Sequence, residues 1–196
     1  MLDRMAGERA FLRATELAHS LLAQRVPSGA TVVDATVGNG IDLVFLSGCV
    51  GPEGRVIGFD LQSEAIKRSK LRWLEAGMKC ALELHAVGHE RMAEFVEGEI
   101  AAAMFNLGWL PSGDKSVVTR KETTLAALDA AVARLQKGGV VTVVCYPGHD
   151  AGAEEAVAAV AWAEALEQEK FSAVRYGFLN QRNAPPFLVA VERRGG

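Results

Sequence analysis

The sequence that decides the fold of this chain is VDATVGNGID at residues 33–42, together with GFD at residues 58–60. An apolar run ends in a turn with two glycines, and a second apolar run ends in a carboxylate. This pattern is typical of an α/β sheet that binds an adenosine group, because glycines let the backbone approach the ligand and the acid accepts hydrogen bonds from ribose hydroxyls. The turn lacks the third glycine of dinucleotide-binding proteins, since Leu43 stands in its place. We therefore predict that the ligand is S-adenosylmethionine.

Length and composition are those of an ordinary globular enzyme. The 196 residues suffice for a substantial core, and we expect a single domain over residues 1–196. The net charge of −3 argues against non-specific coating of DNA, but it allows a local basic patch for a folded RNA. Cys49, Cys80 and Cys145 have no paired spacing, so we expect neither a disulfide framework nor a zinc site. We recognise no signal peptide and no apolar run of about 18 residues, and we expect a cytoplasmic protein.

Apolar runs and turn signals predict seven strands that are mostly separated by helices. The expected strands are residues 31–37, 55–60, 81–86, 100–107, 140–146, 172–179 and 187–192. Helices are expected over about residues 8–24, over 62–76, 90–97 and 152–170, and from a capping box Thr119-x-x-Glu122 to a stop at Gly138-Gly139. The last connection is too short for a helix, so the final strand pair should be antiparallel. The plan is that of a Rossmann-like class I methyltransferase, an α/β fold with a seven-stranded, mostly parallel sheet, an antiparallel last strand and helices on both faces.

Residues at the ends of the first two strands are expected to hold the cofactor. Asp60 is the natural acceptor for two ribose hydroxyls, and Gln62 can add a contact with ribose or adenine. Asn39 and Asp42 can engage the methionine end, whose ammonium needs an oxygen acceptor. The expected cofactor-binding residues also include Asp34, Gly38 and Gly40. Asp34 or Asp42 could instead cap a helix or hold the turn.

The loop after the third expected strand adds two candidates. His89 and Glu90 could hydrogen-bond or stack at the adenine edge, or they could belong to a helix N-terminus with solvated charges. His85 and His89 have the spacing of a metal-binding pair on a helix. However, His85 lies in a predicted strand, and no cysteine or carboxylate set completes a site, so we predict no metal.

Polar residues after the fourth and fifth strands are candidates for the reacting end, because the carboxyl ends of parallel strands share one edge. Asn106 could orient a target amine or close a turn, and either Tyr146 or His149 could accept a proton. The remaining candidates are substrate contacts that could equally be ordinary core, surface or turn residues. They are Trp109 for base stacking, Lys115 for phosphate, and Asn180, Arg182 and Asn183 in a polar hairpin loop.

These motifs together resemble those of the YtqB-like methyltransferase family. The matching segments span nearly the whole domain, at residues 34–42, 88–90, 106–115, 146–149, 180–181 and 185–186. Trp109 and Ser112 stand where Tyr and Gly are expected, which leaves cofactor binding untouched. The resemblance implies cofactor contacts at Asn39, Asp42, Asp60, Gln62, His89 and Glu90. It also implies a tRNA substrate bound through its anticodon stem-loop, with methylation of 5-aminomethyl-2-thiouridine at the wobble position.

The expected function is therefore N-methylation of an RNA base by an S-adenosylmethionine-dependent enzyme. The alternatives are methylation of rRNA, of a small molecule or of a protein on the same fold, and a nucleotide-binding module without catalysis. The N-terminal helix has three open roles. It could contact RNA through Arg4, Arg9 and Arg13, pack on the sheet, or join a second subunit in a homodimer.

Overall fold

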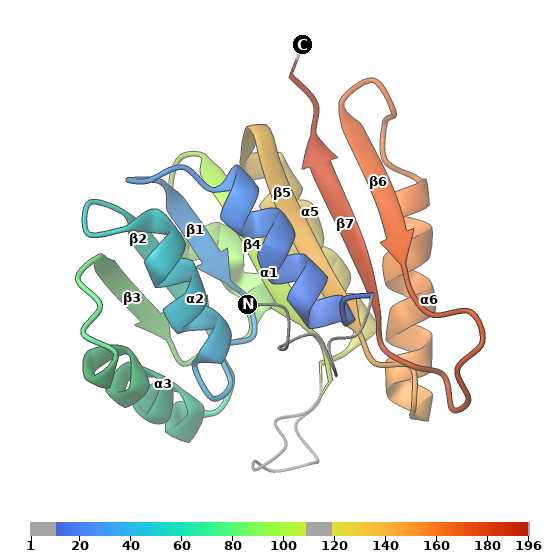
Figure 1. Cartoon of the computed structure of the whole chain (residues 1–196), viewed down its shortest axis with the longest axis horizontal. Helices are drawn as coiled ribbons and strands as arrows, with labels where there is room; N and C mark the ends of the chain where they lie inside the picture. The colour runs from blue at the N-terminus through green and yellow to red at the C-terminus, as the bar shows by residue number, and fades with distance from the viewer. Residues whose placement is uncertain (1–10, 109–118, 196) are drawn as a thin grey trace, which may run out of the picture.

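The computed structural model of the chain describes residues 11–108 and 119–195. Within these residues seven strands form one sheet, in the order β3-β2-β1-β4-β5-β7-β6 (Figure 1). The strands are β1 (Thr31–Asp34), β2 (Arg55–Phe59), β3 (Ala81–His85), β4 (Ile100–Asn106), β5 (Leu135–Cys145), β6 (Phe171–Tyr176) and β7 (Phe187–Arg193). The neighbours from β3 to β5 pair in parallel, and β7 is antiparallel to both β5 and β6. The predicted fold class is confirmed.

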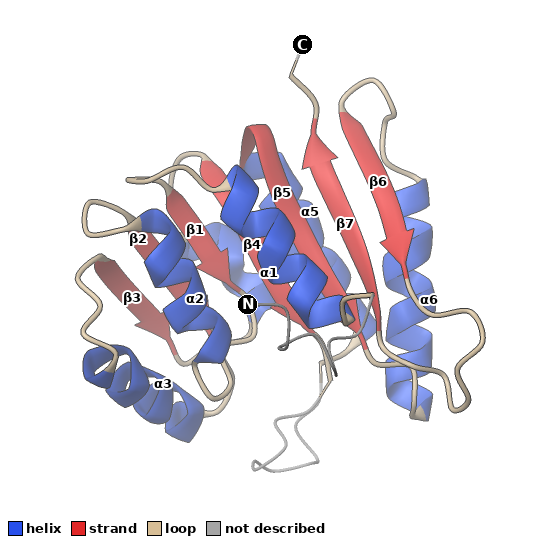
Figure 2. Ribbon diagram, in the orientation of Figure 1, coloured by secondary structure: helices blue, strands red, loops and turns tan. Residues whose placement is uncertain are grey.

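Helices cover both faces of the sheet (Figure 2). One face carries α1 (Ala14–Arg25) and α2 (Ile41–Val50), and the other carries α5 (Lys121–Arg134) and α6 (Asp150–Glu164). The two central strands β4 and β5 are buried almost throughout because side chains on both of their faces meet helices. Among the helices of the described residues, none has the length and apolar character that a membrane crossing needs.

The remaining helices lie on the β3 side of the sheet. The helix α3 (Ser63–Glu75) joins β2 to β3, while η1 (His89–Arg91) and α4 (Met92–Phe95) join β3 to β4. Strand β1 lies between β2 and β4. The chain therefore continues toward the β3 edge of the sheet after β1 and toward the β6 edge after β4. Such a reversal of strand order opens a crevice at the carboxyl ends of the strands.

The N-terminal helix α1 packs against the sheet. Its buried residues Ala14, Ala18 and Leu22 are spaced by four and therefore lie on one face of the helix. The described helix begins at Ala14, later than the predicted start, and Arg13 is its exposed N-cap residue. Arg4 and Arg9 lie outside the described residues. Of the three expected roles for this helix, packing on the sheet is the one that the structure shows.

Two predicted boundaries around α5 are wrong. Thr119 is not the N-cap residue, because the helix begins at Lys121 after Arg120 and the Thr119 hydroxyl is bonded elsewhere. Gly138-Gly139 does not end the helix either. The chain enters β5 directly at Leu135, and a register shift against β4 accommodates the glycines inside the strand. The helix α6 ends at Glu164 and not near residue 170, because the chain turns back into β6.

Candidate active site

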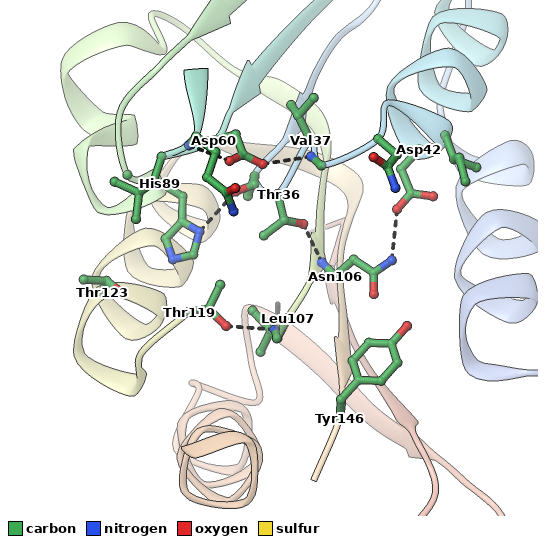
Figure 3. Close-up of a pocket in the computed structure, with 18 of the residues that line it drawn as sticks. Thr36, Val37, Asp42, Asp60, His89, Asn106, Leu107, Thr119, Thr123 and Tyr146 are labelled. Atoms are coloured by element: carbon green, nitrogen blue, oxygen red, sulfur yellow. Dashed lines mark hydrogen bonds between the residues drawn. The ribbon is translucent and has the colours of Figure 1, made fainter. Parts of the chain in front are cut away.

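A cavity of about 560 Å³ lies at the carboxyl ends of β1, β2, β4 and β5 (Figure 3). Its volume falls within the range of roughly 300–1,000 Å³ that is typical of sites for small molecules and cofactors. The loops after these strands and after β3 form most of its wall, and α1 contributes Thr15. The predicted residues that line it are Gly38, Asn39, Asp42, Asp60, Gln62, His89, Glu90, Asn106, Tyr146 and His149.

The glycine turn after β1 forms the floor of the cavity. Gly38 and Gly40 have positive φ angles of 51° and 76°, a conformation that glycine adopts without steric cost. A Cβ atom on Gly40 would lie 2.8 Å from the Cα of Ser69 in α3, so this glycine also allows a close approach of two backbones. Gly40 does not line the cavity. Its predicted contact with the cofactor is therefore wrong, and it shapes the turn from behind.

Asp60, which follows β2, is held by backbone groups. Its Oδ2 accepts a hydrogen bond from the N–H of Gly38 at 2.9 Å, and its Oδ1 accepts one from the N–H of Gln62 at 2.8 Å. Each carboxylate oxygen has two lone pairs, so both can accept a further hydrogen bond from a ligand. The acid thereby fixes the glycine turn relative to the start of α3 and still faces the cavity (Figure 3).

His89 forms a buried part of the wall near Asp60, and only 6% of its surface is exposed. Its Nδ1 lies 3.1 Å from the carbonyl oxygen of Ala35, which can only accept, so Nδ1 carries a hydrogen. Burial lowers the pKa of His89 and favours the neutral ring. Its Nε2 lies 3.4 Å from the hydroxyl of Thr124. The Thr124 hydroxyl gives its hydrogen to Glu155, so Nε2 of His89 can still accept a hydrogen bond, and the expected contact of His89 with an adenine stays a prediction. We name Asp60, Gln62, His89 and Glu90 the Asp60 end of the cavity.

A buried carboxylate behind His89 links this wall to the loop that follows β4. Glu155 in α6 is 2% exposed and accepts hydrogen bonds from the hydroxyls of Thr124 at 2.5 Å and Thr119 at 2.7 Å. Burial raises the pKa of Glu155, although the two threonines act against it. Thr119 also clamps Gly108: its hydroxyl accepts the Gly108 N–H at 2.9 Å, and its own N–H donates to the Gly108 oxygen at 3.3 Å.

Three polar side chains gather at the opposite end of the cavity, which we name the Asn106 end: Asp42, Asn106 and Tyr146 (Figure 3). The Asn106 side-chain amide donates to Oδ2 of Asp42 at 3.3 Å, and its backbone N–H donates to the hydroxyl of Thr36 at 2.7 Å. Asp42 lies on the first turn of α2, and its other oxygen is bonded to His19 of α1. A carboxylate, an amide and a phenol are thus brought together from three elements.

Tyr146 and His149, which both line the cavity, are the two predicted proton acceptors. Burial and the nearby charge of Asp42 raise the pKa of Tyr146, so its side chain stays a phenol at neutral pH. His149 is the N-cap residue of α6, and its Nδ1 accepts the N–H of Gly152 at 3.0 Å. In the neutral ring this bond places the hydrogen on Nε2. The role of Tyr146 or His149 as proton acceptor stays a prediction.

Several predicted site residues lie away from the cavity. Asp34 is fully buried under the turn, where its Oδ1 accepts the N–H of Thr36 at 3.2 Å, and burial raises the pKa of its carboxyl. This is the turn-holding role considered above, not a contact with the cofactor. Asn180, Arg182 and Asn183 are exposed in the connection between β6 and β7, and they do not line the cavity. Trp109 and Lys115 lie outside the described residues.

The comparisons with known proteins agree with this geometry. A protein family described as "Putative rRNA methylase" matches residues 56–192 of the chain. The chain belongs to this family. It is 35% identical to the chloroplastic "tRNA (mnm(5)s(2)U34)-methyltransferase" of Arabidopsis thaliana, over 92% of this chain and 70% of that protein.

Solved structures of the rRNA methylase family have the same fold. A crystal structure described as a "putative rRNA-methylase" from Clostridium thermocellum is 40% identical, with a TM-score of 0.91 over 94% of this chain and all of that one. A "putative methyltransferase" from Streptococcus mutans, in complex with S-adenosylhomocysteine, is 36% identical, with a TM-score of 0.85 over 93% of this chain and 99% of that one.

As a member of the rRNA methylase family, the chain is a methyltransferase that uses S-adenosylmethionine. The predicted cofactor is confirmed, and a nucleotide-binding module without catalysis is set aside. Several residues that build the site carry no recognisable sequence signal. His19 and Thr15 in α1, and the buried pair Thr124 and Glu155, read as ordinary helical residues. Their contacts join segments that are far apart in the chain.

Proposed function

We propose that this methyltransferase N-methylates the 5-aminomethyl group of 2-thiouridine at the wobble position of tRNA and that it acts in the cytoplasm. The name of the chloroplastic relative supports this substrate. The structural observation that carries the proposal is the Asn106 end of the cavity, where an amide oxygen and a phenol lie beside a carboxylate. Such groups recognise an amine through hydrogen bonds and charge.

The described residues fit S-adenosylmethionine. Asp60 has lone pairs left for two ribose hydroxyls after its bonds to the backbone. Gln62, His89 and Glu90 surround the place of the adenine. At the other side of the turn, Asn39 and the carboxylate of Asp42 face the place of the methionine end, whose ammonium is attracted by a negative charge.

The reaction requires alignment more than acid–base chemistry. S-adenosylmethionine supplies a methyl group that is already electrophilic. The protein has to hold an amine nitrogen in line with that group, which is the kind of positioning that accelerates reactions strongly. The Asn106 amide nitrogen is bonded to Asp42, so its Oδ1 is left to accept an N–H of the amine and point the lone pair inward. Tyr146 stays a phenol, and its hydroxyl has Asn106 as a hydrogen-bond partner, which helps to fix the amide in place.

A substrate amine must be neutral before it can attack. Burial in the cavity and the positive sulfonium of the cofactor would both disfavour an ammonium, and they act against the carboxylate of Asp42, which favours it. We therefore propose that proton loss to solvent precedes methyl transfer and that no side chain acts as a strong base.

RNA would reach the cavity across the edge formed by the carboxyl ends of the strands. The pairing of Cys145 with Phe187 sets the connection between β6 and β7 at this edge, next to Tyr146. Asn180, Arg182 and Asn183 are exposed there and could contact a base and a phosphate. Trp109 and Lys115 stay sequence predictions for the same role. The wobble base has to leave the anticodon stack, at a cost of a few kcal/mol.

The direct test is transfer of a labelled methyl group to purified tRNA. A tRNA that carries 5-aminomethyl-2-thiouridine should be labelled, and the same tRNA with 2-thiouridine should not, since it lacks the nucleophile. Asp60→Ala should abolish the labelling. Labelling of rRNA or of protein, with none of the tRNA, would replace the proposed substrate by one of the alternatives.

A second test uses cells with and without the gene. Mass spectrometry of tRNA nucleosides should show that 5-aminomethyl-2-thiouridine accumulates when the gene is deleted, and that the methylated nucleoside returns when the gene is restored. Unchanged nucleosides in the deletion strain would argue against a role in wobble modification.

A further inference from the structure

One side chain of the N-terminal helix reaches the cavity wall through another residue. The Nε2 of His19 lies 2.7 Å from Oδ1 of Asp42. The His19 ring also stacks on Phe45, with centroids 3.9 Å apart and an angle of 11° between the planes. Phe45 follows Asp42 by three residues in α2, so one turn of that helix fixes both the face and the edge of the imidazole.

These contacts leave Asp42 with little freedom. Its Oδ1 is bonded to His19 from α1, and its Oδ2 accepts the Asn106 amide from the end of β4. The Asp42 side chain is 11% exposed and lines the cavity. Thr15, one helical turn before His19, lines the cavity itself, so the same face of α1 carries a residue that reaches the ligand space and one that reaches Asp42.

We propose that His19 is a positioning residue for the methionine end of the cofactor and that it acts by holding the carboxylate of Asp42. The inference rests on the proposed contact of Asp42 with the cofactor ammonium, and it does not depend on the RNA substrate. An unrestrained aspartate samples several rotamers, and only some of them point into the cavity. The bond to His19 and the stack on Phe45 remove those alternatives before the ligand arrives. Preorganisation of this kind increases affinity by lowering the ordering cost.

The test is a double-mutant cycle on the binding of S-adenosylhomocysteine, measured by isothermal calorimetry. His19→Ala and Asp42→Asn should each weaken binding by about 10-fold, in line with loss of one hydrogen bond to a charged group. The double variant should bind no more weakly than Asp42→Asn alone, because the histidine acts only through the aspartate. His19→Gln, which keeps a side-chain donor, should restore most of the affinity. Gln24→Ala, on the same helix but bonded only to Ser20, should bind as the wild type does.

A second ligand separates positioning from general damage. Methylthioadenosine has the adenosine and the sulfur but lacks the amino-acid tail, so its affinity should be the same in the wild type and in His19→Ala. Equal losses for both ligands would overturn the proposal, as would additive losses in the double variant or unchanged affinity for S-adenosylhomocysteine in His19→Ala. If His19→Ala does not fold, Phe45→Leu takes its place in the cycle, because it removes the stack and leaves the bond. If the binding results are as expected but tRNA is not methylated, the role of His19 stands and only the proposed substrate is refuted.

Discussion

The two ends of the cavity are built in different ways. At the Asp60 end, the carboxylate is held by backbone N–H groups that lie 2 and 22 residues away in the sequence. At the Asn106 end, the contacts join side chains to side chains, over 64 residues between Asn106 and Asp42 and over 23 between His19 and Asp42. The first geometry follows from a turn and a strand end. The second exists only once α1, α2 and β4 have packed together.

This difference fits the separate tasks that we propose for Asp60 and Asn106, while Asp42, at the Asn106 end, is proposed to bind the cofactor as well. A carboxylate held by backbone groups keeps its position whatever the neighbouring side chains are, which suits a ligand group common to all methyltransferases of this fold. An arrangement of side chains can change with each substitution, which suits recognition of a particular nucleophile. We therefore expect substitutions at the Asp60 end to affect cofactor affinity and substitutions at Asn106 to affect turnover.

The largest effect is expected at the Asp60 end. Asp60→Ala removes the proposed ribose acceptor together with the two bonds that fix the turn and the start of α3. Binding of S-adenosylhomocysteine should weaken by roughly 100-fold or more, since hydrogen bonds to charged groups contribute about 1.5–3 kcal/mol each. Calorimetry would measure it, with Asp60→Asn as a control that retains one acceptor oxygen. If Asp60→Ala weakened binding of S-adenosylhomocysteine by less than 10-fold, the Asp60 end would not dominate cofactor affinity.

A smaller effect, on turnover and not on cofactor affinity, is expected for Asn106→Ala. Its turnover should fall by roughly 30-fold, because the amine loses the group that orients its lone pair. Affinity for S-adenosylhomocysteine should change by less than about 3-fold, since Asp42 keeps its bond to His19. Single-turnover methylation and calorimetry on the same variant separate the two quantities. Tyr146→Phe, which removes only the hydroxyl, is the matched milder variant. A loss of affinity as large as the loss of turnover would contradict the division between the ends.

The smallest effect concerns the buried Glu155 behind His89. Its pKa is raised in the folded protein, so the stability that its protonated form contributes is present at low pH and is lost as pH rises through the folded pKa. Glu155→Gln does not titrate at this position. The free energy of unfolding of Glu155→Gln, relative to the wild type, should therefore increase between pH 5 and pH 8, by something of the order of 1 kcal/mol. Urea unfolding at three pH values measures this. If the free energy of unfolding of Glu155→Gln fell relative to the wild type toward pH 8, the folded protein would prefer the ionised carboxylate.

Much of the fold, and the Asp60 end, could be predicted from the sequence. The turn with Gly38 and the acid at Asp60 are local patterns, and the physical reasons for them act over a few residues. The antiparallel final pair followed from the length of one connection. Local signals misled where a residue makes longer-range contacts instead. Thr119 is of a residue type that often caps a helix, but its hydroxyl is bonded to Gly108 and Glu155.

The Asn106 end could be predicted only in part. Asn106 and Tyr146 follow strands whose ends share an edge, which is enough to place them in one region. The sequence does not show that Asp42 is hydrogen-bonded to both His19 and Asn106, or that the His19 side chain points toward α2. In a helix pattern His19 reads as a polar residue beside the apolar stripe of Ala14, Ala18 and Leu22. Contacts between distant segments leave no periodic trace in a single sequence.

The paired hydrogen bonds between Gly108 and Thr119 have a consequence for protein engineering. They join position 108 to position 119 directly, and the bond from Thr119 to Glu155 anchors this junction to α6. The entropy of closing a loop between two joined positions grows only with the logarithm of the loop length, so inserts of different size can be grafted between them at little thermodynamic cost.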